Sequence, residues 1–330
     1  MIDTKQVIFS GFLVVFCLYN VRTEAQLQVG FYRFSCPSAE GIVKDEVLKA
    51  FIQNNGVAAG LVRMHFHDCF VRGCDGSVLI DTVNPSSPAE KDSPPNNPSL
   101  RGFEVIDSAK ARLEAVCARK VSCADILAFA ARDSVEITRG LGYEVPAGRK
   151  DGRVSSSSEA LANLPPPTSN VNQLTQAFAN KGLTQEEMVT LSGSHTIGRS
   201  HCASFSNRLY NFNTTTSQDP TLDPNYANQL KAACPQGSTN PNLVVPMDPP
   251  SPATSDVSYY RGVLSNRGLF TSDQTLLTNQ QTLSQVIQNS QNLFGWQIKF
   301  ANAMVKMGKI GVLTGNNTGE IRVDCRVINS

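Results

Sequence analysis

The chain has 330 residues, of which 41% are hydrophobic, and its 29 basic and 28 acidic residues nearly cancel to a formal net charge of +1. A chain of this length exceeds what most single hydrophobic cores can use, so we expect one large domain or two interleaved halves. The near-zero charge gives no basic surface for nucleic acid and no strong attraction for an acidic partner.

The first 25 residues have the pattern of a secretory signal peptide. Lys5 precedes a mostly apolar run from Val7 to Tyr19, which is too short to span a bilayer comfortably. Small residues around Ala25 suit cleavage, so the mature domain is expected to cover residues 26–330 and to begin with Gln26 as pyroglutamate. A short membrane anchor is the alternative interpretation.

Removal of this segment takes away Cys17 and leaves eight cysteines. An even number in an oxidising compartment predicts four disulfides, although the spacing alone does not choose among the many possible pairings. Two sequons, which begin at Asn213 and Asn316, also fit secretion and predict glycosylation.

Helical periodicity dominates the rest of the chain. Apolar residues recur at three- and four-residue steps from Ala39 to about His67, and Asn54-Asn55-Gly56 divides this tract into two helices. Ser122 and Thr184 are predicted N-caps, because Asp125 and Glu187 follow three residues later. Clear β-alternation is scarce, so the fold class is mainly α. Further helices are predicted over 103–116, 122–140, 171–180, 184–192 and 294–307.

Three connecting segments are rich in Pro, Ser and Asn: Asn84–Ser99, Ser155–Asn170 and Asn213–Pro252. Connections this long are usually functional or pinned by disulfides. The segment Ser155–Asn170 is also a soft boundary between two halves of the chain.

The four histidines fall in two clusters, His65 with His67 and His195 with His201. A helix through the first cluster places Arg63 and His67 on one face, where a fixed cation beside an imidazole could move a proton and stabilise negative charge. A strand would instead align His65, His67 and Cys69 for zinc. The upstream periodicity favours the helix, and a core histidine beside a surface arginine is the structural alternative.

The segment that follows, Asp68 to Ser77, crowds carboxylates, a hydroxyl and glycine-freed carbonyls into ten residues. Hard oxygen ligands suit Ca²⁺, but the residues fit a tight loop closed by a Cys69–Cys74 disulfide equally well. In the second cluster, His195 follows a capped helix and a small-residue turn, so it could be an axial metal ligand or a structural histidine. His201 has no motif and is taken as structural.

Two segments together resemble the distal and proximal haem motifs of the secretory plant (class III) peroxidases: Arg63-Met64-His65-Phe66-His67-Asp68-Cys69-Phe70-Val71 and Leu191-Ser192-Gly193-Ser194-His195-Thr196-Ile197-Gly198. The resemblance spans the mature chain. It implies a mainly α, two-domain helical haem peroxidase fold with haem b between the domains. It also implies the disulfides Cys36–Cys117, Cys69–Cys74, Cys123–Cys325 and Cys202–Cys234.

The resemblance also implies roles for residues on the distal side of the haem. His67 would act as the acid and base that takes a proton from hydrogen peroxide and delivers it to the leaving oxygen, and Arg63 would stabilise the leaving charge. Asn96 would accept the other imidazole N–H and keep His67 basic. Phe66 would shield the iron-bound oxygen.

On the proximal side, the resemblance makes His195 the axial iron ligand and Asp273 the carboxylate that bonds its far nitrogen and supports high-valent iron. The product would be an oxoferryl porphyrin radical, which two one-electron steps return to ferric haem. Phenolic donors at the exposed haem edge would supply the electrons, and Pro165 would line their site.

Two structural calcium ions are implied in the same way, which favours calcium for the acidic loop. Ser251 departs from the commoner threonine of the family but keeps the hydroxyl. The distal ion would use Asp68, Val71, Gly73, Asp75 and Ser77, and the proximal ion Thr196, Asp248, Ser251, Thr254 and Asp256.

The implied protein is a secreted, monomeric enzyme that reduces hydrogen peroxide and oxidises lignin precursors, suberin and wall phenolics or auxin, without nucleic-acid or membrane partners. Because the chain ends five residues after Cys325, no vacuolar extension is expected, and the apoplast or cell wall is the expected location. A catalytically inactive wall or binding protein on the same fold is the alternative.

Overall fold

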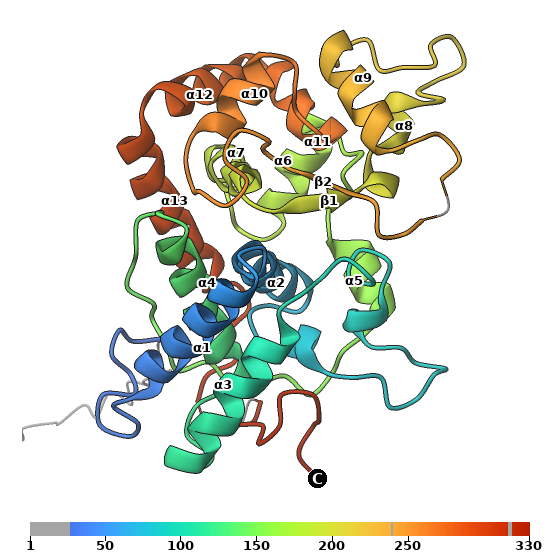
Figure 1. Ribbon diagram of the computed structural model, residues 1–330. Coiled ribbons are helices and arrows are strands. Elements are labelled where there is room, and N and C mark those ends of the chain that lie inside the picture. Colours follow the sequence, from blue (N-terminus) through green and yellow to red (C-terminus); the bar gives the residue numbers. More distant parts are fainter. Residues whose placement is uncertain (1–26, 239, 316–318) are drawn as a thin grey trace, which may run out of the picture.

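The computed structural model describes residues 27–238, 240–315 and 319–330. The predicted signal segment 1–25, Gln26 and the sequon residue Asn316 lie outside the described residues. Over the described ranges the fold is mainly α, and its one sheet has two short antiparallel strands (Figure 1). The predicted fold class is therefore confirmed.

Four long helices gather in the lower part of Figure 1, together with two single-turn 3-10 helices from the connections between them. The predicted break at Asn54-Asn55-Gly56 separates the first two of these helices, and the second continues past His67. The elements are α1 (Ala39–Gln53), α2 (Val57–Val71), η1 (Ser77–Leu79), η2 (Glu90–Asp92), α3 (Phe103–Val116) and α4 (Cys123–Ile137).

The upper part of Figure 1 holds most of the later elements, and the last helix runs down beside the lower group. These elements are α5 (Ser157–Asn163), α6 (Val171–Ala179), α7 (Gln185–Ser192), η3 (Gly193–Thr196), β1 (Arg199–His201), η4 (Cys202–Ser204), α8 (Ser206–Leu209), α9 (Pro224–Ala233), β2 (Val244–Pro246), α10 (Ser258–Leu264), α11 (Thr271–Gln274), η5 (Thr275–Leu277), α12 (Gln280–Gln291) and α13 (Leu293–Met307).

Hydrogen bonds from side chains fix several helix starts where the sequence predicts them. Ser122 Oγ accepts from the Asp125 amide at 3.1 Å and begins α4, while Thr184 and Glu187 form a reciprocal capping box at α7. The predicted long connections contain more structure than expected, because α5 lies within Ser155–Asn170, and α9 and β2 lie within Asn213–Pro252. Asp223 caps α9 with Pro224 in its first turn, a start pattern that the sequence analysis did not use.

Two large hydrophobic cores flank α2. One core joins α1, α3 and α4 and receives Leu61 and Met64 from α2. The other joins α6, α7, α10, α12 and α13 and receives Phe70 from the opposite side of α2. A smaller third core lies around α8, α9 and β2. Helix α2 is therefore clamped between two packed bodies, which fixes the direction of each of its side chains.

Four disulfides close the described chain: Cys36–Cys117, Cys69–Cys74, Cys123–Cys325 and Cys202–Cys234. These are the pairs that the family resemblance implies. Cys123–Cys325 joins residues 202 positions apart and returns the C-terminal segment to the start of α4. The C-terminal segment is therefore covalently tied to the N-terminal group of helices.

A buried ion pair links α4 to the end of α13. Arg149 Nη1 donates to Asp125 Oδ1 at 2.6 Å, and both side chains are almost completely excluded from solvent. The same guanidinium donates to the carbonyl of Gly308, and Tyr32 OH donates to Asp125 Oδ2 at 2.7 Å. One carboxylate thus ties three distant segments together.

Replacing Arg149 with methionine should lower the free energy of unfolding by about 3–5 kcal/mol, because it leaves the Asp125 carboxylate buried without its counter-ion. Urea unfolding followed by circular dichroism measures this loss. Lys44→Met is the matched control, since Lys44 pairs with Glu136 at the exposed surface and its loss should cost less than about 1 kcal/mol. Equal losses in the two variants would contradict the role of the buried pair.

None of the helices within the described ranges is long and apolar enough to cross a membrane.

Candidate active site

Helix α2 carries Arg63, Phe66 and His67, so the helical interpretation of the first histidine cluster is correct. The zinc interpretation is wrong. His65 does lie close to two cysteines, with its Nδ1 3.7 Å from Cys69 Sγ, but that sulfur is bonded to Cys74 and cannot serve as a thiolate ligand. His67 points away from this group.

A chain of hydrogen bonds orients the His67 ring. Asn96 Nδ2 donates to the carbonyl of Glu90 at 2.6 Å, which turns Asn96 Oδ1 toward His67 Nδ1 at 2.5 Å. The amide oxygen can only accept, so His67 Nδ1 carries the proton and donates it. His67 Nε2 is then the unprotonated nitrogen, whose lone pair can accept a proton as a base requires.

Arg63 is held beside that nitrogen by three contacts. Its Nε donates to His67 Nε2 at 3.1 Å, its Nη1 to Ser99 Oγ at 2.9 Å and its Nη2 to the carbonyl of Pro95 at 2.7 Å. Burial, together with the Arg63 charge, lowers the pKa of His67 well below its usual value. His67 is therefore a neutral proton acceptor next to a fixed cation.

Phe66 covers the neighbouring part of α2. Its ring lies 4.3 Å from the Phe70 ring and 6.1 Å from the Phe178 ring between centroids, and it meets the His67 ring edge-on at 5.5 Å. These contacts fix an apolar wall beside the His67 imidazole.

His195 lies in η3 and is anchored by Asp273. The His195 Nδ1 and Asp273 Oδ1 atoms are 2.7 Å apart, and Asp273 also accepts from Tyr259 OH at 3.0 Å and from the Phe270 amide at 2.8 Å. Burial opposes ionisation of Asp273, but the His195 charge and these hydrogen bonds hold its pKa below the usual value. A carboxylate that accepts from Nδ1 makes the opposite ring nitrogen a stronger ligand.

The exposed side chains of α2 and of the His195 segment suit a flat cofactor bound between the two. Ala59, Arg63 and Phe66 are the partly exposed residues of α2, whose 15 residues are all described, and they share one face of the helix. Gly198, three residues after His195, faces Ala59 so closely that an added Cβ would lie 2.8 Å from the alanine Cβ. The His195 side chain is 36% exposed, and its Nε2 receives no hydrogen bond from the described residues. The residues therefore suit a haem bound through His195 Nε2.

The acidic loop after α2 folds back on itself. Asp68 Oδ2 accepts from the Gly76 amide at 2.9 Å, and Asp75 Oδ1 accepts from the Ser77 amide at 3.0 Å. Gly73 has a φ of +103°, and a Cβ there would lie 2.5 Å from the Gly311 carbonyl oxygen, so glycine is required. The five residues predicted for the distal calcium ion all lie in this folded-back segment, and Lys181 Nζ donates to the carbonyl of Val71 at 3.2 Å.

Oxygen atoms in and beside this loop are buried without hydrogen-bond partners among the described residues. Ser77 Oγ and both carboxylate oxygens of Glu90 have no hydrogen-bond partner in the described structure. Burial and the charge of Asp68 raise the pKa of Glu90 to about 9, and burial with the charge of Asp75 raises the pKa of Asp68 well above its usual value. Such a set of buried oxygens suits a divalent cation.

The five residues predicted for the proximal calcium ion also converge. Thr196 Oγ1 lies 3.2 Å from Asp248 Oδ2, 3.3 Å from the Thr254 carbonyl oxygen and 3.1 Å from Asp256 Oδ1. Ser251 Oγ donates to Asp248 Oδ2 at 3.2 Å, so its hydroxyl belongs to the same oxygen cluster. Burial and the charge of Asp256 raise the pKa of Asp248. The proline-rich segment therefore still forms an oxygen cluster.

Sequence reasoning missed three residues of these clusters. Glu90 stands beside the distal loop, Tyr259 bonds Asp273, and Ser258 Oγ donates to Asp248 and to Asp256 Oδ1. Glu90 lies six residues before Asn96. No sequence pattern predicts that its backbone carbonyl accepts from the Asn96 side chain. For Ser258, the one available signal is its position two residues after Asp256, a predicted ligand of the proximal ion.

Two further predicted residues lie at the surface. Pro165 is partly exposed in the connection between α5 and α6, and this connection reaches α11 because the Ser272 amide donates to the carbonyl of Pro167 at 2.9 Å. Asn213 is exposed, and its Oδ1 accepts from the amide and hydroxyl of Thr215.

Comparisons with known proteins agree with this site. A family model described as Peroxidase matches residues 43–292. The chain is 74% identical over 318 residues to Peroxidase 5 of Vitis vinifera, covering 96% of each chain. It is 53% identical to Peroxidase 1 of Zea mays, over 94% of this chain and 86% of the relative, and 52% identical to Peroxidase 3 of Arabidopsis thaliana, over 93% of each.

The helical fold and the family match are those of a peroxidase. The chain belongs to the plant peroxidase family and is a peroxidase enzyme.

His65 should make the stability of this protein depend on pH. Burial lowers its pKa to about 3, so the unfolded chain binds a proton below about pH 6.5 while the folded protein does not. The contribution of His65 to the free energy of unfolding is therefore at its maximum above about pH 6.5, and it decreases as the pH falls toward 3. His65→Leu should reduce the slope of unfolding free energy against pH by about 1.4 kcal/mol per unit in that window. An unchanged slope in denaturant titrations would contradict a neutral, buried His65.

Proposed function

We propose that this peroxidase binds haem b between α2 and His195, reduces hydrogen peroxide to water and oxidises small phenolic donors by one-electron steps. The proposal rests on the hydrogen-bond chain Arg63–His67–Asn96 and on the His195–Asp273 pair, whose segment approaches α2 where Gly198 faces Ala59. The two sets of residues would address opposite faces of one group.

Proton movement is the task of His67. Its Nε2 lone pair would take the proton from the peroxide oxygen nearer the iron and return it to the outer oxygen as the O–O bond breaks. Asn96 keeps the ring in the tautomer that can do this, because it holds the proton on Nδ1. The Arg63 guanidinium, fixed by Ser99 and Pro95, would stabilise negative charge on the departing oxygen. Phe66 would restrict access to the inner oxygen.

Iron chemistry would come from the haem, which supplies the electrons that break the O–O bond. His195 Nε2 would hold the iron, and Asp273 would give the imidazole anionic character through Nδ1. Tyr259 and the Phe270 amide keep Asp273 ionised and in place. These residues would therefore favour the electron-poor forms of the iron that the reaction requires.

The proposal also covers the electron donors, the calcium ions and the location of the protein. Phenolic donors such as lignin precursors would bind at the haem edge beside Pro165. The two oxygen clusters would hold calcium ions. The sequence pattern of residues 1–25, the four disulfides and the exposed Asn213 sequon support secretion to the apoplast or cell wall. The protein would act there as a monomer. An inactive wall or binding protein would be favoured by loss of Arg63, His67 or His195, and all three are present.

His67→Leu should keep haem bound, as the Soret band reports, and slow the reaction with hydrogen peroxide by roughly 10²–10⁴-fold, because the proton acceptor is removed. Stopped-flow mixing with peroxide measures this rate. His65→Leu is the matched control, since His65 is buried on the same helix but faces the Cys69–Cys74 disulfide. A normal peroxide rate in His67→Leu would refute the proposed role.

Removing calcium should lower both thermal stability and activity. The ions would bind the native state alone, and without them the buried charge of Asp68 and Asp75 is offset mainly by the Arg322 guanidinium. Chelation with EGTA should therefore lower Tm by about 5–10 °C, and added calcium should restore it. If Tm and activity stay constant in protein that metal analysis shows to be calcium-free, both proposed ion sites are wrong.

A further inference from the structure

The distal loop, Asp68–Ser77, is held from outside by three segments that are remote in the sequence. The Gly152 amide donates to the carbonyl of Asp75 at 2.7 Å, and the Cys74 amide donates to the carbonyl of Ile310 at 2.9 Å. The third contact comes from a side chain, since Arg322 Nη2 donates to the carbonyl of Gly76 at 2.6 Å. That carbonyl lies between two predicted calcium ligands, Asp75 and Ser77.

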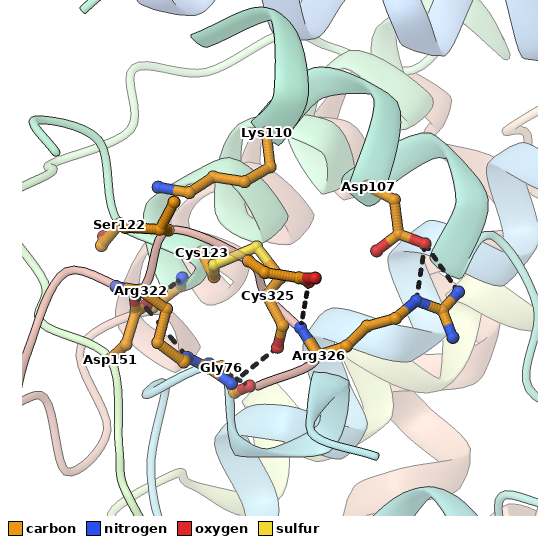
Figure 2. The surroundings of a disulfide bond; sticks show 12 residues. Gly76, Asp107, Lys110, Ser122, Cys123, Asp151, Arg322, Cys325 and Arg326 are labelled. Carbon is orange, nitrogen blue, oxygen red and sulfur yellow. Dashed lines mark hydrogen bonds and ion pairs between the residues drawn. A yellow bond between two sulfur atoms is a disulfide. The ribbon is translucent and has the colours of Figure 1, made fainter. Parts of the chain in front are cut away.

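Arg322 is completely buried in this position (Figure 2). Its Nη1 donates to the carbonyl of Cys325 at 2.7 Å, and its amide donates to Asp151 Oδ2 at 2.9 Å. Gly76 has a φ of +68°, and an added Cβ there would lie 2.7 Å from Arg322 Nη2. The guanidinium is therefore packed directly against the loop backbone, and a bulkier loop residue would displace it.

Charge also couples Arg322 to the loop. Asp68, Asp75 and Asp151 are buried carboxylates, and the charge of this guanidinium acts on all three. One guanidinium and one divalent cation together neutralise three carboxylates. Loss of either cation leaves buried negative charge uncompensated, so each cation should favour retention of the other.

The position of Arg322 is set by the C-terminal segment that carries it. The Cys123–Cys325 disulfide fixes this segment to the start of α4, and the Ala124 amide donates to Asp151 Oδ1 at 2.9 Å. The Glu320 and Asp151 backbones also exchange hydrogen bonds in both directions. Arg322 thus approaches the loop from a rigid support.

We propose that Arg322 is a positioning residue for the distal calcium ion: it holds the Gly76 carbonyl and balances the buried carboxylates, so the retention of the ion depends on the C-terminal segment. This inference rests on the calcium sites of the proposed function. Because Asp68 follows His67 directly in α2, the same contact supports the position of the distal histidine.

Arg326 offers a matched control four residues away (Figure 2). Its side chain is 37% exposed and donates to Asp107 Oδ2 at 2.8 and 2.6 Å. It also pairs with Asp81 at the surface and makes no hydrogen bond to residues 68–77 among the described contacts. Arg322→Lys and Arg326→Lys are therefore the same chemical change, made once at a residue that contacts the distal loop and once at a residue that does not.

The test measures calcium release from the haem-loaded protein. Wild type and both variants are mixed with excess EGTA, desalted at intervals and analysed for bound calcium by atomic absorption. Arg322→Lys should release one of its two ions about tenfold faster or more, the effect of losing one charge-assisted hydrogen bond, while the second ion leaves at the wild-type rate. Arg326→Lys should release both at the wild-type rate. An Asp256→Asn background removes one of the two proximal carboxylates and should weaken the proximal ion. In protein that metal analysis shows to hold a single ion, the faster ion should be the one that remains.

Three results would overturn the inference in distinguishable ways. Wild-type release of both ions from Arg322→Lys removes the role of Arg322 but leaves the calcium sites intact. Equal acceleration of both ions, or the same acceleration in Arg326→Lys, indicates general destabilisation. Wild-type protein that carries no calcium refutes the calcium sites themselves and this inference with them.

A second measurement needs no substitution of Arg322. In the Asp256→Asn protein, removal of the remaining ion should speed hydrogen exchange about tenfold or more in peptides that cover 319–325, because coupling between the ion and this segment is reciprocal. Peptides from α1 should exchange at an unchanged rate. Equal exchange in 319–325 with and without the ion would overturn the inference even if Arg322→Lys fails to fold.

Discussion

Consecutive residues of α2, His67 and Asp68, point into two different sites, and much of the structure serves to keep them there. His67 faces Asn96 and Arg63, whereas Asp68 accepts hydrogen bonds from the loop that begins at the end of the same helix. A helix turns about 100° per residue, so a small rotation of α2 would misplace both side chains at once. The two hydrophobic cores that grip α2 from opposite sides prevent this rotation.

Desolvation sets the chemistry of each centre. Burial keeps His67 neutral beside a permanent cation, while hydrogen bonds keep Asp273 ionised although it is buried. The acidic loop is the opposite case, since its carboxylates are buried with oxygen atoms that no described group satisfies. Burial of a titratable group therefore has two results here: it keeps His67 a neutral proton acceptor, and it makes a bound cation favourable at the acidic loop.

Much of the local structure could be predicted from the sequence. The break before α2, the caps at Ser122 and Thr184, and the shared helix face of Arg63 and His67 depend on residues within one or two turns of each other. The helices inside the long Pro- and Ser-rich connections were missed, because composition outweighed cap patterns such as Asp223-Pro224. For the acidic loop, periodicity left calcium and a disulfide-closed turn undecided, and the structure contains the disulfide together with unsatisfied oxygens.

By itself, the sequence determined the elements and the reactive residue types: a helix with an arginine and a histidine four residues apart, a histidine after a capped helix, and eight cysteines after residue 25. Only the tertiary structure decided which of these residues meet. Asn96 reaches His67 across 29 positions, Asp273 reaches His195 across 78, and Arg322 reaches Gly76 across 246. Such pairs depend on how whole helices pack and where disulfides return the chain, and these long-range contacts leave no periodic pattern in the sequence.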